Sequence, residues 1–224
     1  MVEISPRLSM MASLVDGPAR CLGDVGTDHG YLPVFCVQQG VCNRAIASDI
    51  NEGPLTRAEK NIRAYGLLDR IELRLCSGLS GYQPGECDWT SICGMGGHLI
   101  CDILQAALDA KGIAVGQSFV ISPHTNEEQV RRFLCENGFR VLREAACEDA
   151  GHIYLGIVCV YDGVSREISK VDAVVGCSTI LPPYYYDNLV RKARKRLAGL
   201  AAGSRSDDLE VALLQDVIRK VESL

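Results

Sequence analysis

The sequence has no Cys-x-x-Cys pair and only four histidines, and those are the residues from which structural zinc sites are built. We therefore expect no metal site. We expect no signal peptide, and the sequence has no internal repeat and no apolar stretch near the ~20 residues of a membrane span. Its eleven cysteines are odd in number and lie mostly in apolar runs, as Cys93 and Cys159 do. They are predicted to be buried thiols of a cytoplasmic protein rather than a disulfide framework.

The charge is unevenly divided along the chain. Apolar residues make up 47% and charged residues 23%, as in an ordinary globular protein with a sizeable core. Residues 1–162 hold 13 Lys and Arg against 20 Asp and Glu, a net charge of −7, and residues 163–224 hold 10 against 8, a net charge of +2. We therefore predict an acidic main domain over 1–162 and a more basic extension over 163–224.

Short apolar runs alternate with helical patterns through the first part of the chain, which predicts a doubly wound parallel sheet of an α/β fold. Two further strands are joined by only four residues, Glu148 to Gly151, too few for a crossover helix, so they form an antiparallel edge hairpin. The seven strands are expected at residues 20–24, 44–50, 71–75, 88–93, 118–122, 139–147 and 152–162.

Helix boundaries also have sequence signals. Gly66, Gly112 and Gly138 follow helical patterns as stop signals, and Thr125 or Asn126 is expected to cap the helix that Gly138 ends. In the extension, apolar residues recur at helical spacing on both sides of residues 203–206. That pattern predicts a coiled-coil-like helical hairpin with arms about 28 Å long.

Polar loops follow the first three strands, where a doubly wound sheet binds its ligands. The loop from Asp24 to Pro33 contains two glycines, and Asp49 ends the second strand, where a carboxylate can accept both hydroxyls of a ribose. The loops therefore favour an adenosine-type ligand. The alternatives are that the first loop is only a tight turn and that Asp49 caps the next helix. The residues expected to hold it are Asp24, Gly26, Thr27, Asp49, Ile50, Ser77, Gly78 and Leu79.

The loops after the fourth and fifth strands are expected to face the second substrate. Gly94 and Met95 belong to a glycine-rich turn that opens a helix, with His98 just inside it, and His124 follows the fifth strand. Gly94 is assigned to the cofactor side, and Met95, His98 and His124 to the substrate side. An anion at the helix N-terminus and an ordinary exposed histidine are the alternatives.

The densest basic run of the chain lies in the extension. Five of the six residues from Arg191 to Arg196 are basic, and we assign RNA contact to Arg191, Lys192, Arg194 and Lys195. The alternative is a solvated helix face whose charge is neutralised by nearby acids, Asp187, Asp207 and Asp208.

The motifs DVGTDHGYLP (24–33) and CGMGG (93–97), with GPL (53–55) and GL (78–79), resemble the bacterial tRNA methyltransferases that modify N1 of adenine 22. The resemblance runs from about Arg7 to Asp162. It implies a class I methyltransferase fold, S-adenosylmethionine as cofactor and tRNA as partner. We expect a monomer or weak dimer. For that reaction we assign catalytic roles to Asp28, as the charge that favours the methylated adenine, and to His29 and Tyr31, which orient Asp28 or contact the base. The alternative for Asp28 is that it only binds the ammonium group of the cofactor.

Two departures from the family's pattern keep other functions open. Ser77 stands where the family commonly has Asp, and Ser122-Pro123-His124 stands where many members have Gln-Pro-Asn. One alternative is a small-molecule methyltransferase in which the extension is a lid or dimer element. The other is a nucleotide-binding regulatory module without catalysis.

Overall fold

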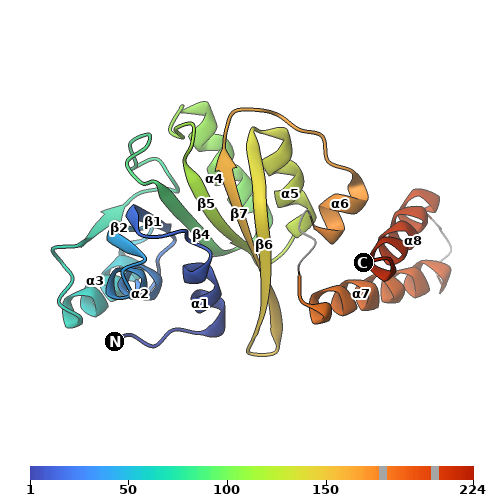
Figure 1. Ribbon diagram of the computed structural model, residues 1–224, viewed down its shortest axis with the longest axis horizontal. Coiled ribbons are helices and arrows are strands. Elements are labelled where there is room, and N and C mark those ends of the chain that lie inside the picture. Colours follow the sequence, from blue (N-terminus) through green and yellow to red (C-terminus); the bar gives the residue numbers. More distant parts are fainter. Residues whose placement is uncertain (177–180, 203–206) are drawn as a thin grey trace.

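The computed structural model describes residues 1–176, 181–202 and 207–224. A seven-stranded sheet in the order β3-β2-β1-β4-β5-β7-β6 forms its centre (Figure 1). Its strands are β1 (Ala19–Val25), β2 (Cys42–Asp49), β3 (Ile71–Leu75), β4 (Trp89–Met95), β5 (Ser118–Pro123), β6 (Phe139–Asp149) and β7 (His152–Tyr161).

The strand predictions are confirmed. β1 to β5 are parallel, and β7 runs antiparallel to both of its neighbours, β5 and β6. The link between β6 and β7 is shorter than expected, because Asp149 still pairs with His152. Only Ala150 and Gly151 remain for the turn, both with positive φ, 49° and 76°. Two such residues give a turn whose twist matches that of the hairpin.

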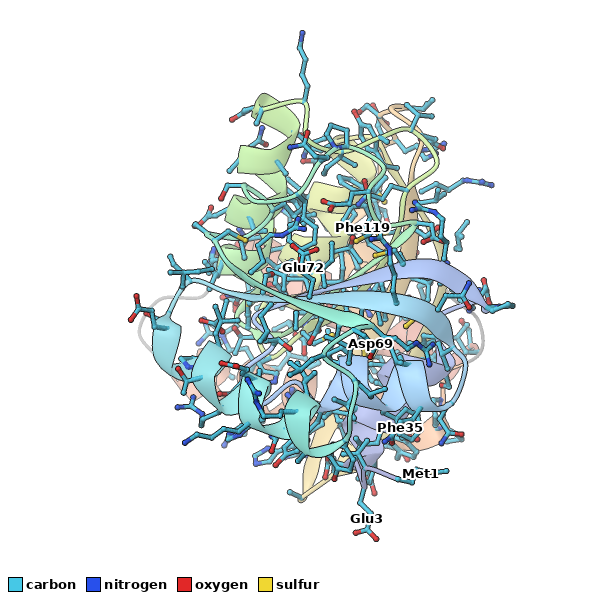
Figure 2. The ribbon with its side chains drawn as sticks, turned by 90° about the vertical axis from the view of Figure 1, so that its left-hand side faces the viewer. Met1, Glu3, Phe35, Asp69, Glu72 and Phe119 are labelled. Atoms are coloured by element: carbon cyan, nitrogen blue, oxygen red, sulfur yellow. The ribbon has the colours of Figure 1, made fainter. Side chains whose placement is uncertain are left out.

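Helices cover both faces of the sheet. They are α1 (Pro6–Ser13), α2 (Tyr31–Gln38), α3 (Glu52–Ala64), α4 (Gly97–Asp109), α5 (Glu127–Glu136), α6 (Lys170–Val175), α7 (Pro183–Ala202) and α8 (Asp208–Glu222). One core packs α4 and α5 around Phe119, and the other packs α1, α2 and α3 with Phe35 at its edge. Figure 2 shows Phe119 and Phe35 on opposite sides of the strands. In the described parts of the chain, no helix has the length and apolarity needed to cross a bilayer.

Some helix predictions were wrong in detail. The α5 helix is preceded by Asn126 with a φ of 59°, and neither its side chain nor that of Thr125 makes a capping bond. After α4, Lys111 and not Gly112 adopts the positive φ, at 53°. The α1 helix was missed, although its start has the expected signals: Ser5 accepts from Leu8 N and a proline follows it.

The extension is helical as predicted, but its arms are unequal. At 1.5 Å per residue, the 20 residues of α7 span about 30 Å and the 15 residues of α8 about 22 Å. Asp207 caps α8 by accepting from Leu209 N and Glu210 N. The turn predicted at residues 203–206 lies outside the described residues. The domain boundary at residue 162 stays a prediction, and buried side chains of the extension, Leu181 and Tyr185, share the core around Phe119.

A buried polar network joins the extension to the sheet. The Arg131 and Glu144 side chains are fully buried and form an ion pair of 2.6 Å between Nε and Oε1. Arg131 also donates to the Ala173 carbonyl oxygen and to the Tyr185 hydroxyl, both at 2.9 Å. A guanidinium satisfied on every side in this way ties α5, β6, α6 and α7 together.

Breaking this network should destabilise the protein strongly. Arg131→Met leaves the Glu144 carboxylate buried without its cation, which costs about 3–5 kcal/mol. The control Arg63→Ala removes an exposed helix pair with Glu59, for which we expect under about 1 kcal/mol. Urea unfolding measures both. A loss at Arg131 as small as that at Arg63 would contradict the assigned role.

Candidate functional site

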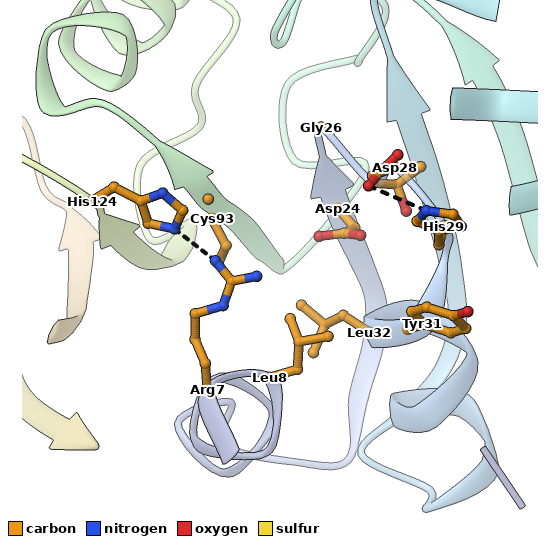
Figure 3. A pocket seen from close by; sticks show the side chains of 12 residues that line it. Arg7, Leu8, Asp24, Gly26, Asp28, His29, Tyr31, Leu32, Cys93 and His124 are labelled. Atoms are coloured by element: carbon orange, nitrogen blue, oxygen red, sulfur yellow. Dashed lines mark hydrogen bonds and ion pairs between the residues drawn. The ribbon is translucent and has the colours of Figure 1, made fainter. Parts of the chain in front are cut away.

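A cleft of ≈ 340 Å³ opens beyond the carboxyl ends of β1, β4 and β5 (Figure 3). This inner cleft is lined by the loop after β1, the start of α2, one face of α1, Cys93, Gly94 and His124. The sequence predicted a site at this edge, and the structure brings eight predicted residues to it. They are Asp24, Gly26, Thr27, Asp28, His29, Tyr31, Gly94 and His124.

The loop after β1 is held tightly from behind. The backbone amides of Gly26 and Thr27 both donate to the Ser48 carbonyl oxygen at 2.9 Å. Gly26 has a φ of 76°, and a Cβ there would overlap the Met95 methyl group. This position therefore favours glycine for its conformation, whereas the Met95 methyl group, at the end of a flexible side chain, could move aside. The result is a backbone turn whose open side faces the cleft.

Asp24 is the buried carboxylate of the inner cleft. Asp24 lies near the end of β1 and is 5% exposed. Among the described residues, no cation forms an ion pair with it. Burial raises the pKa of Asp24 to about 6, against the smaller opposing effect of the Thr27 and Ser91 hydroxyls. A carboxylate kept dry and without a cation is poised to bind a positively charged ligand group.

Asp28 lies at the rim and has a partner that the sequence did not reveal. Its side chain is 59% exposed and accepts from Arg57 of α3 at 2.6 Å. His29 Nε2 lies 3.6 Å from the other carboxylate oxygen, and the His29 and Tyr31 rings stack with centroids 5.5 Å apart. Asn61 of α3 donates to the His29 carbonyl oxygen. The α3 helix thus positions this side of the rim.

The opposite wall is cationic, and sequence reasoning missed its main residue. Arg7 of α1 donates to His124 Nε2 at 2.6 Å, and its guanidinium lies 5.2 Å from the centre of the Tyr154 ring. Partial burial and the charge of Arg7 lower the pKa of His124. In Figure 3 the side chains of Arg7 and Asp24 reach the cleft from different elements. The signal available was the helix start Ser5-Pro6 just before Arg7.

The remaining cofactor candidates lie outside the inner cleft. Asp49 ends β2, where one of its carboxylate oxygens accepts from Asn51 N, and Ile50 beside it is 64% exposed. Cys76 N donates to the Asp49 carbonyl oxygen, which brings the next loop alongside. That loop, Ser77 to Leu79, lines a separate cavity of ≈ 390 Å³ against α4. Asp49 and Ile50 follow β2, the neighbour of β1, and the loop from Ser77 to Leu79 follows β3, the next strand in the sheet.

Two of the residues predicted to contact the substrate lie away from the inner cleft. Met95 packs its methyl group under Gly26, and His98 is exposed on α4, so neither lines the inner cleft. Cys93 does line it, and burial raises the pKa of its thiol to about 12. That thiol therefore stays protonated at neutral pH and is not an activated nucleophile.

The basic run of α7 divides into two groups. Arg194 pairs with Glu222 at 2.8 Å and Arg196 with Glu210 at 2.6 Å, both across to α8. Arg191 and Lys192 instead line a cavity beside the inner cleft. Glu210 and Glu222 thus neutralise part of the run, and the sequence had not indicated these two acids.

The chain is similar to known proteins. Residues 4–157 match the methyltransferase domain family. The tRNA (adenine(22)-N(1))-methyltransferase of Bacillus subtilis is 30% identical over 171 residues, 73% of this chain and 71% of that one. Streptococcus pneumoniae Sp1610, solved with S-adenosyl-L-methionine, is 31% identical with a TM-score of 0.84, covering 98% and 99% of the two chains. Mycoplasma capricolum TrmK, solved with S-adenosyl-homocysteine, is 25% identical with a TM-score of 0.81, covering 98% and 96%.

The strand order, the single reversed strand β7 and the cleft beyond β1 and β4 define a class I methyltransferase. Within that class, the chain belongs to the tRNA (adenine-22-N1)-methyltransferase family, as its identity to the Bacillus subtilis enzyme and the share of both chains covered show. The resemblance stated from the motifs is confirmed.

The raised pKa of Asp24 makes a prediction about stability. Its folded value of about 6 exceeds the ordinary 3.8, so between those values the folded chain binds more protons than the unfolded chain. The free energy of unfolding therefore falls as the pH rises from about 4 to about 6, by about 2–3 kcal/mol. Asp24→Asn removes this loss.

Urea unfolding of the ligand-free protein at pH 4 and pH 7 checks this. Between the two values Asp24→Asn should gain about 2–3 kcal/mol relative to the parent. Asp69→Asn, which neutralises an exposed carboxyl before β3, should follow the parent at both. An Asp24→Asn curve parallel to that of the parent would show that the carboxyl is not destabilised by burial.

Proposed function

We propose that this chain is an enzyme that methylates N1 of adenine 22 in tRNA, with S-adenosylmethionine as the methyl donor. Its family membership supports the reaction class. The observation that carries the cofactor is the pair of opposite charges in the inner cleft, Asp24 and Arg7. An amino acid in its zwitterionic form has one ammonium and one carboxylate, and the methionine end of this cofactor is such a group.

The residues present fit that cofactor along its length. Asp24 would bind the ammonium group and Arg7 the carboxylate, with the backbone of Gly26 and Gly94 close to the chain between them. Asp49 would accept the ribose hydroxyls, since among the described residues its carboxylate accepts a hydrogen bond only from Asn51 N, within its own turn. Ile50 and the loop from Ser77 to Leu79 would hold the adenine.

When bound, S-adenosylmethionine supplies a methyl group on a sulfonium that is open to attack by a nucleophile. Adenine N1 has a free lone pair at neutral pH, so the reaction needs no general base. The contribution of the chain's own residues is to hold the acceptor in line with the methyl group. Methylation makes the adenine a cation. Asp28 at the rim supplies a negative charge that favours it, and the stacked rings of His29 and Tyr31 offer a face for the base.

The extension is proposed to contact tRNA, because the main domain with its net charge of −7 repels a polyanion. Met95, His98, Arg194 and Lys195 keep their proposed substrate roles, although the first two lie away from the inner cleft. We further propose that the protein works in the cytoplasm, where tRNA is modified, and as a monomer or weak dimer.

Transfer of tritium from labelled S-adenosylmethionine to a tRNA transcript tests the function. We expect label in 1-methyladenosine after digestion to nucleosides, and none when adenine 22 of the transcript is replaced by guanine. Label at another base would contradict the position. Label in small molecules alone would favour a small-molecule methyltransferase, and cofactor binding without transfer would favour a regulatory module.

Asp28→Asn in the same assay separates its two possible roles. If the carboxylate favours the cationic product, turnover at saturating cofactor should fall about 10²-fold while the affinity for S-adenosylhomocysteine changes little. Asp69→Asn is the control, because it removes an equal charge far from the cleft. Weakened cofactor binding with full turnover would instead make Asp28 a cofactor ligand.

A further inference from the structure

A second cavity of ≈ 490 Å³ lies beside the inner cleft, and His124 lines both. This outer cleft lies between the β6–β7 turn, the start of α5 and the middle of α7. Its volume is in the range that encloses a small ligand such as one nucleotide. In Figure 1, α7 begins beside the long β6–β7 hairpin and leads away from it.

The walls of the outer cleft differ in chemistry. The hairpin side has aromatic rings, with His152 and Tyr154 centroids 6.4 Å apart. The α7 side has cations, Arg191 and Lys192, and carboxylates are present at Glu127 and Glu148. A ring that stacks on a base, a cation that meets a phosphate, and a carboxylate that accepts from a base amino group are the three elements of nucleotide recognition.

The ion pairs of α7 explain why only part of its basic run faces this cleft. Arg194 and Arg196 are held toward α8 by Glu222 and Glu210. Arg191 is turned by a 2.7 Å hydrogen bond to Asn188, which also lines the cleft. Lys192 is exposed and forms no ion pair within the described parts of the chain.

We propose that the outer cleft binds the nucleotide next to the target adenosine in the RNA chain. This inference rests on the proposed function and adds a second subsite to it. A base inside a structured RNA must leave its stack to reach the inner cleft, and its neighbour then loses a stacking partner. A neighbour that stacks on His152 while its phosphate meets Lys192 offsets that loss. His124 separates the two bases at the wall that both clefts share.

Two single substitutions test separate parts of this subsite. His152→Ala removes stacking, so the tRNA Kd should rise about 5- to 100-fold with an unchanged salt dependence. His152→Phe keeps a ring and should bind like the parent. Lys192→Ala removes one phosphate contact, so the slope of log affinity against log salt should become shallower by a little under one unit. Tyr154 is left intact because Arg7 packs on its ring.

These affinities are measured by filter binding without cofactor, and Kd for S-adenosylhomocysteine is measured alongside. Arg196→Gln is the control on the same helix, and it should leave the salt slope unchanged because Arg196 faces Glu210. Parent-like tRNA binding by both His152→Ala and Lys192→Ala would overturn the subsite, as would equal weakening by Phe and Ala at residue 152. If the parent binds tRNA through these residues but methylates no adenine, the proposed function fails, and the outer cleft is an RNA-binding site without a target adenosine beside it.

Discussion

The buried ion pair between Arg131 and Glu144 determines where the extension stands against the sheet. Both side chains are out of water, and each is stable there only because the other is present. Through the Ala173 carbonyl and the Tyr185 hydroxyl the same guanidinium fixes α6 and the start of α7. Gly176 is required beside it, since a Cβ there would crowd the Glu144 carboxylate. The outer cleft exists because α7 is held at this place.

The two carboxylates of the inner cleft, Asp24 and Asp28, lie in different surroundings. In the inner cleft, Asp24 is buried and forms no ion pair with any of the described residues, so its charge is costly until a ligand compensates it. At the rim, Asp28 is exposed and already paired with Arg57, so its charge costs little. Arg7 and His124 form the wall between these carboxylates and the outer cleft. The cofactor and the target base would thus share the inner cleft, and the neighbouring nucleotide would lie on the other side of this wall.

Most of the fold could be predicted because its strands are short apolar runs and its loops carry glycines at strand ends. The inner cleft was predictable for the same reason, since parallel strands bring Asp24, Gly94 and His124 to one edge. Arg131 was not, because an arginine in a charged helix segment (Glu-Glu-Gln-Val-Arg-Arg) is indistinguishable from a surface residue until Glu144 and Tyr185 are placed. Arg57, the partner of Asp28, is 29 residues away from it in sequence, and Arg7 is 117 residues away from its partner His124. Only tertiary packing brings these pairs together.

The central claim is that the Asp24 carboxylate of the inner cleft binds the cofactor's ammonium group. Calorimetric titration with S-adenosylhomocysteine from pH 7.5 to pH 5 tests it most directly. Because only the ionised carboxylate attracts the ammonium, the parent's affinity should fall as the pH drops through about 6, toward about tenfold per unit. Asp24→Asn should bind more weakly at pH 7.5 and lose that pH dependence. Equal affinity and equal pH dependence in the two proteins would contradict the account.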